Sequence, residues 1–302
     1  MRRWGRSRVA MVLGTSTGGI DRTEQALEVH RQTARMPVGY DFLQQHNFAA
    51  YCQLFKRVSG VTGPAYVLST ACSSSAKVFA SGARLIDAGL ADAVLVGGVD
   101  TLCKTTLFGF RSLDILAEER CRPFGKDRKG INIGEGGALL LLERSGDASA
   151  VLLGVGESSD AHRMTSPHPE GLGARLAMGR ALADAGMSAE QVDHINAHGT
   201  GTSQNDAAEA TAIHDLFADR TPVVSTKAFT GHTLGAAGAI EAVFACLSLV
   251  HGFVPPSLGA EPVSPEIRVQ VNQRVCDRQL RAVLSNSFGF GGSNCSLLFG
   301  AP

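Results

Sequence analysis

Four residues in this chain stand where the local sequence would let their side chains do chemistry: one cysteine, two histidines and one lysine. The apolar residues 66–68 predict a buried strand, and the serines at 73–75 are suited to cap a helix that runs to about residue 88. Cys72 is therefore expected at a sharp strand-to-helix turn, where backbone N–H groups and the helix dipole favour its thiolate. The alternative is a small buried cysteine that fills a strand–helix joint, and this stretch alone does not separate the two.

The first histidine lies in the segment from Asn196 to Thr202, just after a predicted buried strand. The glycines at 199 and 201 let other groups approach His198 closely, which suits a ligand-binding or acid/base group. The alternative is a turn histidine whose ring is hydrogen-bonded to nearby backbone.

The lysine and the second histidine share one segment, residues 225–238. Lys227 ends a predicted buried strand, and because lysine is seldom fully buried without a partner, a paired or functional role is indicated. His232 lies near the start of the following helix, whose small residues allow tight packing. A glycine-rich turn at 286–292 offers N–H groups for an anion-binding concavity, or is a plain turn between core strands.

The elements that would position these residues alternate between strands and helices. In the first part, strands are predicted at residues 9–14, 66–68 and 93–99, a Gly/Thr/Ser turn at 15–19, a polar loop at 122–128, and a glycine turn feeding a strand at 134–143. The second part repeats this order with strands at 151–156, 192–197 and 223–227, helices at 173–185 and from about 206, and a glycine turn with a strand at 289–299. This repeated order of strands and helices predicts an α/β protein of two pseudo-equivalent halves, residues 1–150 and 151–302.

The composition excludes several classes of function. Lys+Arg and Asp+Glu both number 28, which gives no support for broad electrostatic binding to nucleic acid or to an anionic membrane. The seven cysteines include no CxxC pair or metal-ligand spacing, so most are expected to be core residues in a reducing cytoplasm. No apolar run is expected to span a membrane, and the start lacks the apolar core of a signal peptide. A soluble cytoplasmic protein is predicted.

Together these segments resemble the β-ketoacyl-[acyl carrier protein] synthases, the elongating condensing enzymes of the thiolase superfamily. The matching segments, in the family's order, are STACSSS at 69–75, HGTGT at 198–202, STKAFTGHTLGAAG at 225–238 and NSFGFGG at 286–292. GEGG around Glu135 and the RPF loop at Arg122 fit as well. The likeness covers nearly all of the chain from Val9 onward and implies a thiolase-like fold with α-β-α-β-α layers. Family members normally begin with a further strand–helix–strand segment, so the first half is expected to be N-terminally truncated.

The resemblance implies a decarboxylative condensation of fatty-acid or polyketide type, with aryl-polyene synthesis as one such pathway. Cys72 would carry the acyl group, and malonyl carrier protein would supply the attacking enolate. His198 and His232 would bind the malonyl thioester oxygen as negative charge develops, and histidine would assist as acid/base. The N–H groups of Cys72 and Phe290 would form a second oxyanion site, with Phe290 as a gate between the half-reactions. Lys227 would balance the charge of the site.

Further residues are implied to bind the substrate or to support the site. Thr200 and Thr202 fall where the family hydrogen-bonds the phosphopantetheine arm of the carrier protein. Glu209 is a candidate partner of Lys227, and Phe288 is grouped with it as a supporting residue.

The same resemblance implies which ligands and partners to expect. Asn196 and Glu241 match positions that hold a structural monovalent cation in some relatives. No other cofactor is implied, because the substrates travel on the phosphopantetheine of acyl carrier protein. A homodimer, or a heterodimer with a ketosynthase-like subunit, is expected, with no nucleic acid and no membrane as partner.

Other functions remain open within and beyond this family. One is a non-catalytic partner subunit like the chain-length factors, or a truncated inactive homologue, although such subunits typically lack the nucleophile. A biosynthetic thiolase needs a second catalytic cysteine in the C-terminal glycine turn, where this chain has Phe290 and places Cys295 beyond it. Condensing enzymes that use Cys-His-Asn are disfavoured, because His232 stands where the asparagine is expected.

Overall fold

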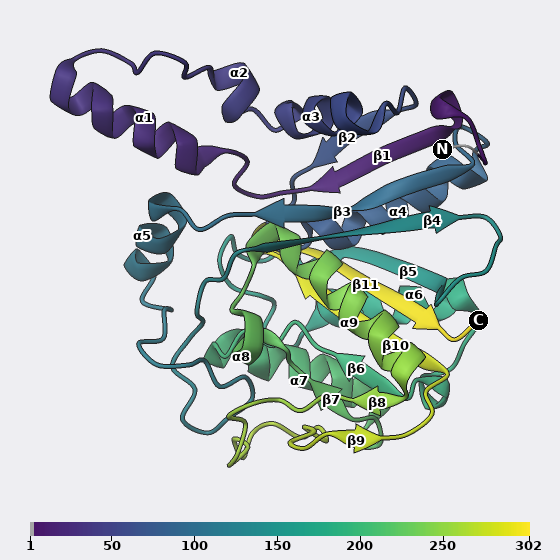
Figure 1. Cartoon of the computed structure of the whole chain (residues 1–302). Helices are drawn as coiled ribbons and strands as arrows, with labels where there is room; N and C mark the ends of the chain where they lie inside the picture. The colour runs from purple at the N-terminus through teal and green to yellow at the C-terminus, as the bar shows by residue number, and fades with distance from the viewer. Residues whose placement is uncertain (1–2) are drawn as a thin grey trace.

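The structure, a computed structural model, describes residues 3–302 and contains two main sheets (Figure 1). The first sheet has the order β2 (Ala65–Leu68), β1 (Val9–Gly14), β3 (Ala93–Asp100), β4 (Gly136–Glu143). The second has the order β5 (Val151–Ser159), β11 (Ser293–Gly300), β10 (Ala282–Phe288), β6 (His194–Asn196), β7 (Val223–Val224). In each sheet three neighbouring strands are parallel, namely β2, β1 and β3 in the first, and β10, β6 and β7 in the second.

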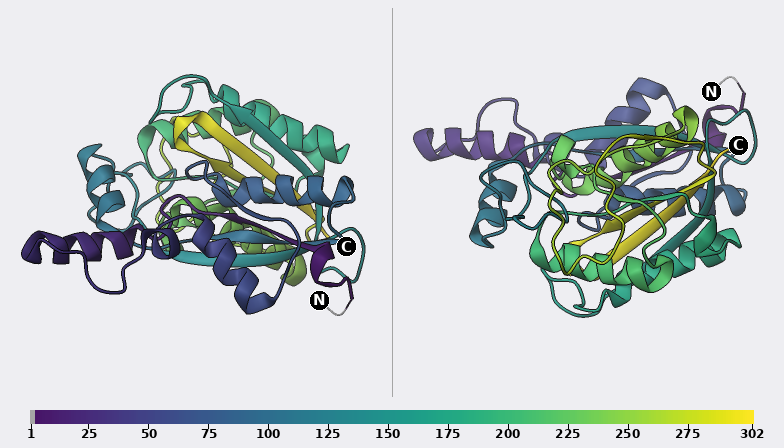
Figure 2. Two further views of the ribbon diagram at one scale, coloured as in Figure 1. Left: turned by 90° about the horizontal axis from the view of Figure 1, so that it is seen from above. Right: turned by 90° about the horizontal axis from the view of Figure 1, so that it is seen from below.

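Helices cover both sheets and also separate them. Two helices, α4 (Ser74–Asp87) and α9 (Ala237–His251), contact each other and strands of both sheets, so they form the central layer. The outer face of the first sheet packs on α3 (Ala49–Ser59), and that of the second on α6 (Leu172–Ala185), which also contacts α7 (Ser203–Phe217). Figures 1 and 2 show these α-β-α-β-α layers, which confirm the predicted fold.

Strand β1 shows how the alternating side chains of one strand serve two layers. Ala10 and Val12 belong to the cluster between the sheets, whereas Met11 and Leu13 pack with Cys52 of α3. All six residues of the strand are buried, as a period of two requires when both faces of a sheet are covered. The apolar run at 9–14 therefore belongs to a central strand.

The shorter elements lie at the ends and edges of this core. One helix, α1 (Ile20–Thr33), extends away from the body in both figures. The other elements are η1 (Arg6–Arg8), α2 (Phe42–Gln45), α5 (Lys104–Ser112), η2 (Ala189–Gln191), α8 (Lys227–Thr230), η3 (Leu234–Ala236), β8 (Phe253–Val254), β9 (Cys276–Asp277) and η4 (Phe290–Gly292).

Two local predictions are wrong, each because tertiary packing overrides the local pattern. Lys227 begins α8 and does not end a strand, since β7 stops after two residues. Strand β2 is only half-buried, because it lies at the edge of its sheet. The segment 122–128 is a loop, as predicted, although Phe124 is fully buried and Arg128 is buried beside Asp206.

The predicted pseudo-symmetry is visible in the sheets. Strands β1 to β4 precede residue 150 and β5 to β11 follow it, although the proposed boundary between the halves itself stays a prediction. The parallel triplets correspond, and each is extended by an antiparallel strand, β4 or β11. Within the described residues, the first sheet has no counterpart of β5.

One helical stretch of the described chain, Leu234–His251, is long and apolar enough to cross a bilayer, contrary to the sequence prediction. It combines η3 with α9, and 61% of it is buried, so it has the character of the core helix that packs between the two sheets. The seven cysteines are all free thiols, and five of them are buried as expected.

The free energy of unfolding is expected to fall in mild acid because of His194, at the start of β6. The ring is buried, neither nitrogen has a side-chain hydrogen-bond partner among residues 3–302, and burial lowers the pKa of His194 to about 4. Between that value and the ordinary pKa near 6.5, the unfolded chain binds more protons than the folded one, so acid favours unfolding. The full effect of this one group is about 3 kcal/mol, present above about pH 6.5 and lost on going down to about pH 4.

Urea unfolding at about pH 5 and 7.5 measures this effect. A His194→Leu variant should show a smaller pH dependence than the wild type, while His251→Leu, at an exposed position, should match the wild type. Equal pH dependence in wild type and His194→Leu would contradict the assignment.

Candidate active site

The candidate site forms where the parallel strands of both sheets end. Cys72 follows β2, His198 follows β6, Lys227 follows β7 and Phe290 follows β10. Because the carboxyl ends of parallel strands meet at one edge of a sheet, residues far apart in sequence come together there. The interleaved helices α4 and α9 bring the two edges to the same end of the molecule (Figure 1).

Cys72 lies in a tight turn between β2 and α4. Ala71 has a left-handed backbone, with φ of 50°, and the turn is closed by side-chain hydroxyls. Ser73 Oγ donates to the carbonyl of Thr70 at 2.9 Å, and Ser74 Oγ to that of Ala71 at 2.6 Å. The serines were expected to cap α4, but their hydroxyls bond to turn carbonyls and no side-chain cap forms. The turn is rigid and holds the cysteine at the helix N-terminus.

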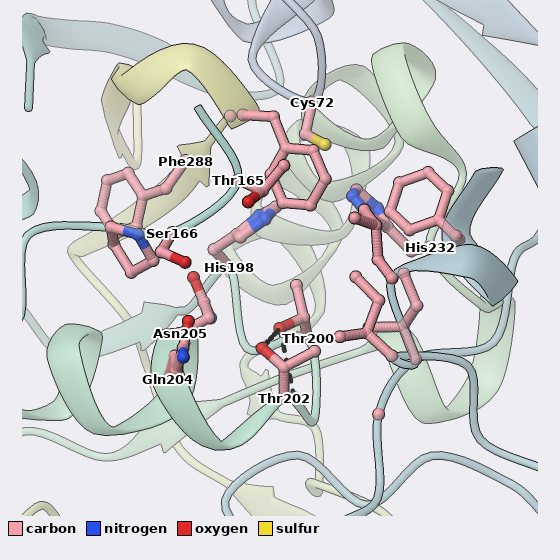
Figure 3. Close-up of a pocket in the computed structure, with 18 of the residues that line it drawn as sticks. Cys72, Thr165, Ser166, His198, Thr200, Thr202, Gln204, Asn205, His232 and Phe288 are labelled. Atoms are coloured by element: carbon pink, nitrogen blue, oxygen red, sulfur yellow. Dashed lines mark hydrogen bonds between the residues drawn. The ribbon is translucent and has the colours of Figure 1, made fainter. Parts of the chain in front are cut away.

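Both predicted histidines approach this sulfur. The Sγ of Cys72 and one ring nitrogen each of His198 and His232 all lie within 4.8 Å of one another. The two imidazoles meet edge to face, with centroids 5.2 Å apart, and Figure 3 shows the sulfur facing them. All three residues are at most 6% exposed. The structure therefore brings together the nucleophile and the two imidazoles that the sequence singles out.

The backbone of His198 is fixed by Glu209 of α7. The N–H groups of His198 and Gly199 each donate to this buried carboxylate at 2.7 Å. A Cβ at Gly199 would lie 2.5 Å from the Cβ of Ser225, so the glycine is required for the close approach that the sequence predicts. The ring of His198 does not bond to nearby backbone and instead lines a cavity.

The backbone of His232 is held by the strand-like segment before β4. Its N–H donates to the carbonyl of Asn132 at 2.7 Å, and its carbonyl accepts from the N–H of Gly134 at 3.0 Å. Neither ring nitrogen has a partner within the described chain. The imidazole is thus anchored through its backbone and is free to donate to a bound group.

Lys227 is paired as expected, but with a different residue. Its Nζ donates to Glu241 of α9 at 2.5 Å, and both side chains are almost completely buried. Glu209, the candidate partner, is occupied by the two backbone N–H groups after β6. The prediction of a Lys227–Glu209 pair is therefore wrong, because the ammonium contacts Glu241 on α9 instead.

Burial decides the protonation of the nucleophile. Desolvation raises the pKa of the Cys72 thiol to about 11, although the Lys227 ammonium and the N–H groups of Phe290 and Cys72 favour the thiolate. The sequence-based expectation of a thiolate is therefore wrong for the free protein. At neutral pH the sulfur carries its proton, and attack on a substrate requires a nearby base.

Both imidazoles are neutral at physiological pH. Burial, and next the positive charge of Lys227, lower the pKa of His198 and of His232 well below the ordinary value of 6.5. A neutral imidazole has one N–H donor and one acceptor nitrogen. The pair can therefore both accept the thiol proton and donate to a developing oxyanion.

These groups open into a cavity of about 440 Å³ that reaches from Cys72 toward the surface. Its walls include Thr200 and Thr202, whose hydroxyls are 2.9 Å apart, and Figure 3 shows both threonines on the opposite side of the cavity from the Cys72 sulfur. Phe288 and Phe290 form another wall. The predicted pantetheine-binding residues, Thr200 and Thr202, and the predicted gate, Phe290, thus line the same cavity as the Cys72 thiol.

The glycine-rich turn after β10 offers less than the predicted anion-binding concavity. The N–H groups of Gly289, Gly291 and Gly292 already donate to backbone carbonyls within the protein. The N–H of Phe290 is the one directed at the Cys72 sulfur. A Cβ at position 289 would lie 3.3 Å from the Cys72 nitrogen and 3.0 Å from the Thr70 carbonyl, so the glycine permits this approach. The turn therefore supplies one donor.

Two further parts of the cavity wall were not predicted from the sequence. One is the loop after β5, in which Asp160, Met164 and Thr165 line the cavity, and Met164 accepts a backbone hydrogen bond from Gly291. The other is Phe110 of α5, whose ring stacks on Phe290 with centroids 5.5 Å apart. A polar, proline-containing loop at a strand end is a usable signal for the first, whereas nothing local marks Phe110.

The candidate cation ligands have suitable chemistry. Asn196 and Glu241 are both buried, and each keeps one side-chain oxygen without a hydrogen-bond partner in the described chain. Unpaired carbonyl and carboxylate oxygens are the donors that hard cations prefer. Each oxygen is thus of the kind that the predicted cation would need, and cation binding by Asn196 and Glu241 stays a prediction.

Comparison with known proteins agrees with this geometry. Residues 2–148 match the N-terminal domain of β-ketoacyl synthases, and residues 149–261 match the C-terminal domain. The chain is 36% identical over 304 residues to Nodulation protein E of Rhizobium meliloti, covering 97% of this chain and 75% of the relative. It is 32% identical to 3-oxoacyl-[acyl-carrier-protein] synthase 2 of Vibrio cholerae, covering 97% and 76%.

Solved structures show the same relationship. The ketosynthase ApeO of Xenorhabdus doucetiae, solved in complex with its chain length factor ApeC, superposes with a TM-score of 0.92 at 43% identity. That match covers all of this chain and 76% of the other. With both domains matched, and with the cysteine and the two histidines lining one cavity, this chain belongs to the β-ketoacyl synthase family.

Proposed function

We propose that this chain catalyses decarboxylative Claisen condensation of an acyl-Cys72 thioester with malonyl-[acyl carrier protein], giving 3-oxoacyl-[acyl carrier protein]. The observation that carries this is the meeting of the Cys72 sulfur with two neutral imidazoles, His198 and His232, at the inner end of an open cavity. The family makes the reaction class plausible, and these three groups supply the chemistry that the reaction needs.

The first half-reaction is acyl transfer. The Cys72 sulfur attacks the acyl carbonyl of a carrier thioester, a new C–S bond forms, and the C–S bond to the carrier breaks. A neutral imidazole takes the thiol proton as the attack begins and passes it to the departing carrier sulfur. The N–H groups of Phe290 and Cys72 lie beside the sulfur and stabilise the tetrahedral oxyanion.

The second half-reaction breaks the bond between the malonyl carboxylate and its methylene carbon. Carbon dioxide leaves, and the electron pair moves onto the thioester as an enolate, whose oxygen accepts hydrogen bonds from His198 and His232. The enolate carbon then attacks the acyl-Cys72 carbonyl and expels the cysteine sulfur, which takes one proton from solvent. Lys227 contributes positive charge close to both imidazoles.

Binding and access follow from the cavity walls. Thr200 and Thr202, which line the cavity, would hydrogen-bond a phosphopantetheine arm that reaches the sulfur. Phe290 lies beside the thiol and stacks on Phe110, so its movement would alter access between the half-reactions. The 440 Å³ volume suits an extended chain of modest size.

The proposed partners are acyl carrier protein and a second ketosynthase-like subunit. The carrier is indicated by the relatives that are 3-oxoacyl-[acyl-carrier-protein] synthases, and the subunit by the ketosynthase solved with its chain length factor. In this chain β2 is an edge strand, and the helix packed on it exposes Leu54 and Val58, which favours a subunit contact there. A cytoplasmic location is proposed, since the cysteines are free thiols.

The test is a complete condensation assay with purified protein, acyl carrier protein loaded with a short acyl chain, and malonyl carrier protein. Mass spectrometry should detect acyl-Cys72 and then the 3-oxoacyl carrier. A protein that binds a catalytically active ketosynthase but forms no acyl-Cys72 would instead be a chain-length-factor-like partner, and the proposed reaction would be wrong.

A further inference from the structure

A buried carboxylate with many donors lies beside the site but takes no part in the proposed chemistry. Asp100 ends β3 and is 1% exposed. It accepts hydrogen bonds from three hydroxyls and three backbone N–H groups, and it takes part in none of the ion pairs found among residues 3–302. Because every partner donates, the group acts as an ionised carboxylate with all its acceptor positions in use.

These donors belong to two segments from different halves of the chain. Thr15, Ser16 and Thr17, in the polar turn after β1, provide all three hydroxyls, at 2.5–2.8 Å, and two of the N–H groups. The third N–H is that of Gly235 in η3, at 2.6 Å from Asp100 Oδ2. The predicted turn after β1 therefore surrounds Asp100, and the same carboxylate binds one backbone N–H group from the other half of the chain, that of Gly235.

The close approach at this point leaves no room for a side chain. A Cβ at Gly235 would lie 2.6 Å from the Ser16 nitrogen and 2.7 Å from Asp100 Oδ2. The preceding residue, Leu234, has φ of 55°, which is unusual for a residue with a branched side chain. A backbone conformation of this kind persists only where its surroundings hold it.

The segment held by Asp100 carries a catalytic imidazole. Gly235 lies three residues after His232, and the two positions are fixed by different contacts: His232 by Asn132 and Gly134, and Gly235 by Asp100. The ring of His232 has no hydrogen-bond partner of its own in the described chain. Its orientation therefore depends on how well these two backbone anchors are fixed.

We propose that Asp100 is a positioning residue for His232: its carboxylate fastens the segment after His232 to the turn after β1 and so holds the imidazole within reach of the Cys72 sulfur. The proposal rests on the proposed function of His232. It explains why a carboxylate with no cationic partner is kept buried at the junction of the two halves, beside a turn rich in hydroxyls.

The informative substitution is Asp100→Asn, which keeps the shape but replaces one oxygen with an NH₂ group. That group would face the N–H of Gly235 or the hydroxyls of the turn, so donor would meet donor and one anchor would be lost. A displaced catalytic group is costly, since about 1 Å can reduce a rate by about a hundredfold. Asp100→Asn is expected to lower kcat for decarboxylation of malonyl carrier protein by about tenfold or more, with KM nearly unchanged.

Acylation of Cys72 should respond differently. The negative charge of Asp100 disfavours the thiolate of Cys72, so removing the charge should not slow acyl transfer from the carrier. A general loss of folded protein would lower both rates by the same factor. A selective loss of decarboxylation thus separates positioning from a merely structural role.

A double substitution tests whether Asp100 acts through His232. If it does, adding Asp100→Asn to His232→Ala should cause little further loss of decarboxylation. If Asp100→Asn lowers the activity of the His232→Ala protein by the same factor as that of the wild type, Asp100 acts independently and the proposal is overturned.

Hydrogen exchange gives a readout that needs no catalysis. Asp100→Asn should speed deuterium uptake over residues 231–236, and Ser16→Ala, which removes one hydroxyl donor, should do so to a smaller extent. The control is Asp193→Asn, because Asp193 also accepts two backbone N–H groups, those of Arg281 and Ala282, at the other end of β6. It should speed uptake near residue 281 and leave residues 231–236 and both rates unchanged.

The outcomes separate the two proposals. If the wild type neither condenses nor decarboxylates, the proposed function fails, while exchange still shows whether Asp100 holds the segment. If the wild type is active but Asp100→Asn matches it in decarboxylation or in exchange over residues 231–236, the positioning role is wrong. Should Asp100→Asn fail to fold, Ser16→Ala with its graded effect on the same two measurements decides.

Discussion

Replacing Cys72 with alanine is expected to abolish acyl transfer from the carrier protein, while loss of carbon dioxide from malonyl carrier protein continues. The sulfur is the atom that forms the acyl-enzyme bond, so without it no other group in the cavity can hold the acyl chain as a thioester. Decarboxylation needs only a bound malonyl thioester and the imidazoles of His198 and His232, which the substitution leaves in place. Intact-protein mass spectrometry measures the first step, and formation of acetyl carrier protein the second.

The matched control is Cys295→Ala, at a fully buried cysteine on β11 that lies outside the cavity lining. It should lose some stability but keep the acyl-enzyme and its rate of formation. If the Cys72→Ala protein still gained the mass of the acyl group, the nucleophile would have to be another residue.

The second large effect is expected at the histidines. Either His198→Ala or His232→Ala should lower the rate of malonyl decarboxylation by about 10²–10³, the usual consequence of losing one oxyanion donor. The reason is the geometry of the pair, because both rings are within 4.8 Å of the sulfur and no protein group replaces either N–H. Acetyl carrier protein formed per enzyme per minute measures the loss.

The pH dependence provides an independent check of the same assignment. Since the pKa values of His198 and His232 are both well below 6.5, the donors stay neutral, and the wild-type decarboxylation rate should be nearly constant between about pH 6 and 8. A rate that falls with a midpoint near 6.5 would show a protonating imidazole and would contradict the neutral-donor mechanism. His194→Leu, at a buried histidine outside the cavity, should keep the wild-type rate.

The identity of the nucleophile follows from Cys72 and its surroundings in sequence, whereas the protonation states follow from burial. A thiol with a pKa of about 11 beside two neutral imidazoles differs from a preformed thiolate, because proton transfer becomes part of acyl transfer. Acyl transfer needs one imidazole as the base, whereas decarboxylation uses both as donors, so loss of one imidazole should slow acylation less than decarboxylation.

The residue types and their order along the chain were enough to predict the α/β fold, the two pseudo-equivalent halves and the residues of the site. The spacing of apolar residues that marks a strand or a helix depends only on neighbouring residues. Strand β1, which is fully buried, and helix α6, which ends before Gly186, therefore lie where this spacing predicts them. Cys72, His198 and Lys227 were singled out by their places at the ends of predicted strands, whereas the roles of all four residues, His232 included, came from the resemblance of their motifs to those of the β-ketoacyl synthases.

Tertiary structure decided what each of these residues contacts. Lys227 pairs with Glu241 and not with Glu209, and Cys72 is a protonated thiol, because distances between distant segments and loss of water are not encoded in local spacing. The role of Asp100 is of the same kind: its six donors come from residues 15–17 and from Gly235, 135 residues away. Local sequence determines the elements, while desolvation and long-range hydrogen bonding arise only when the two halves pack.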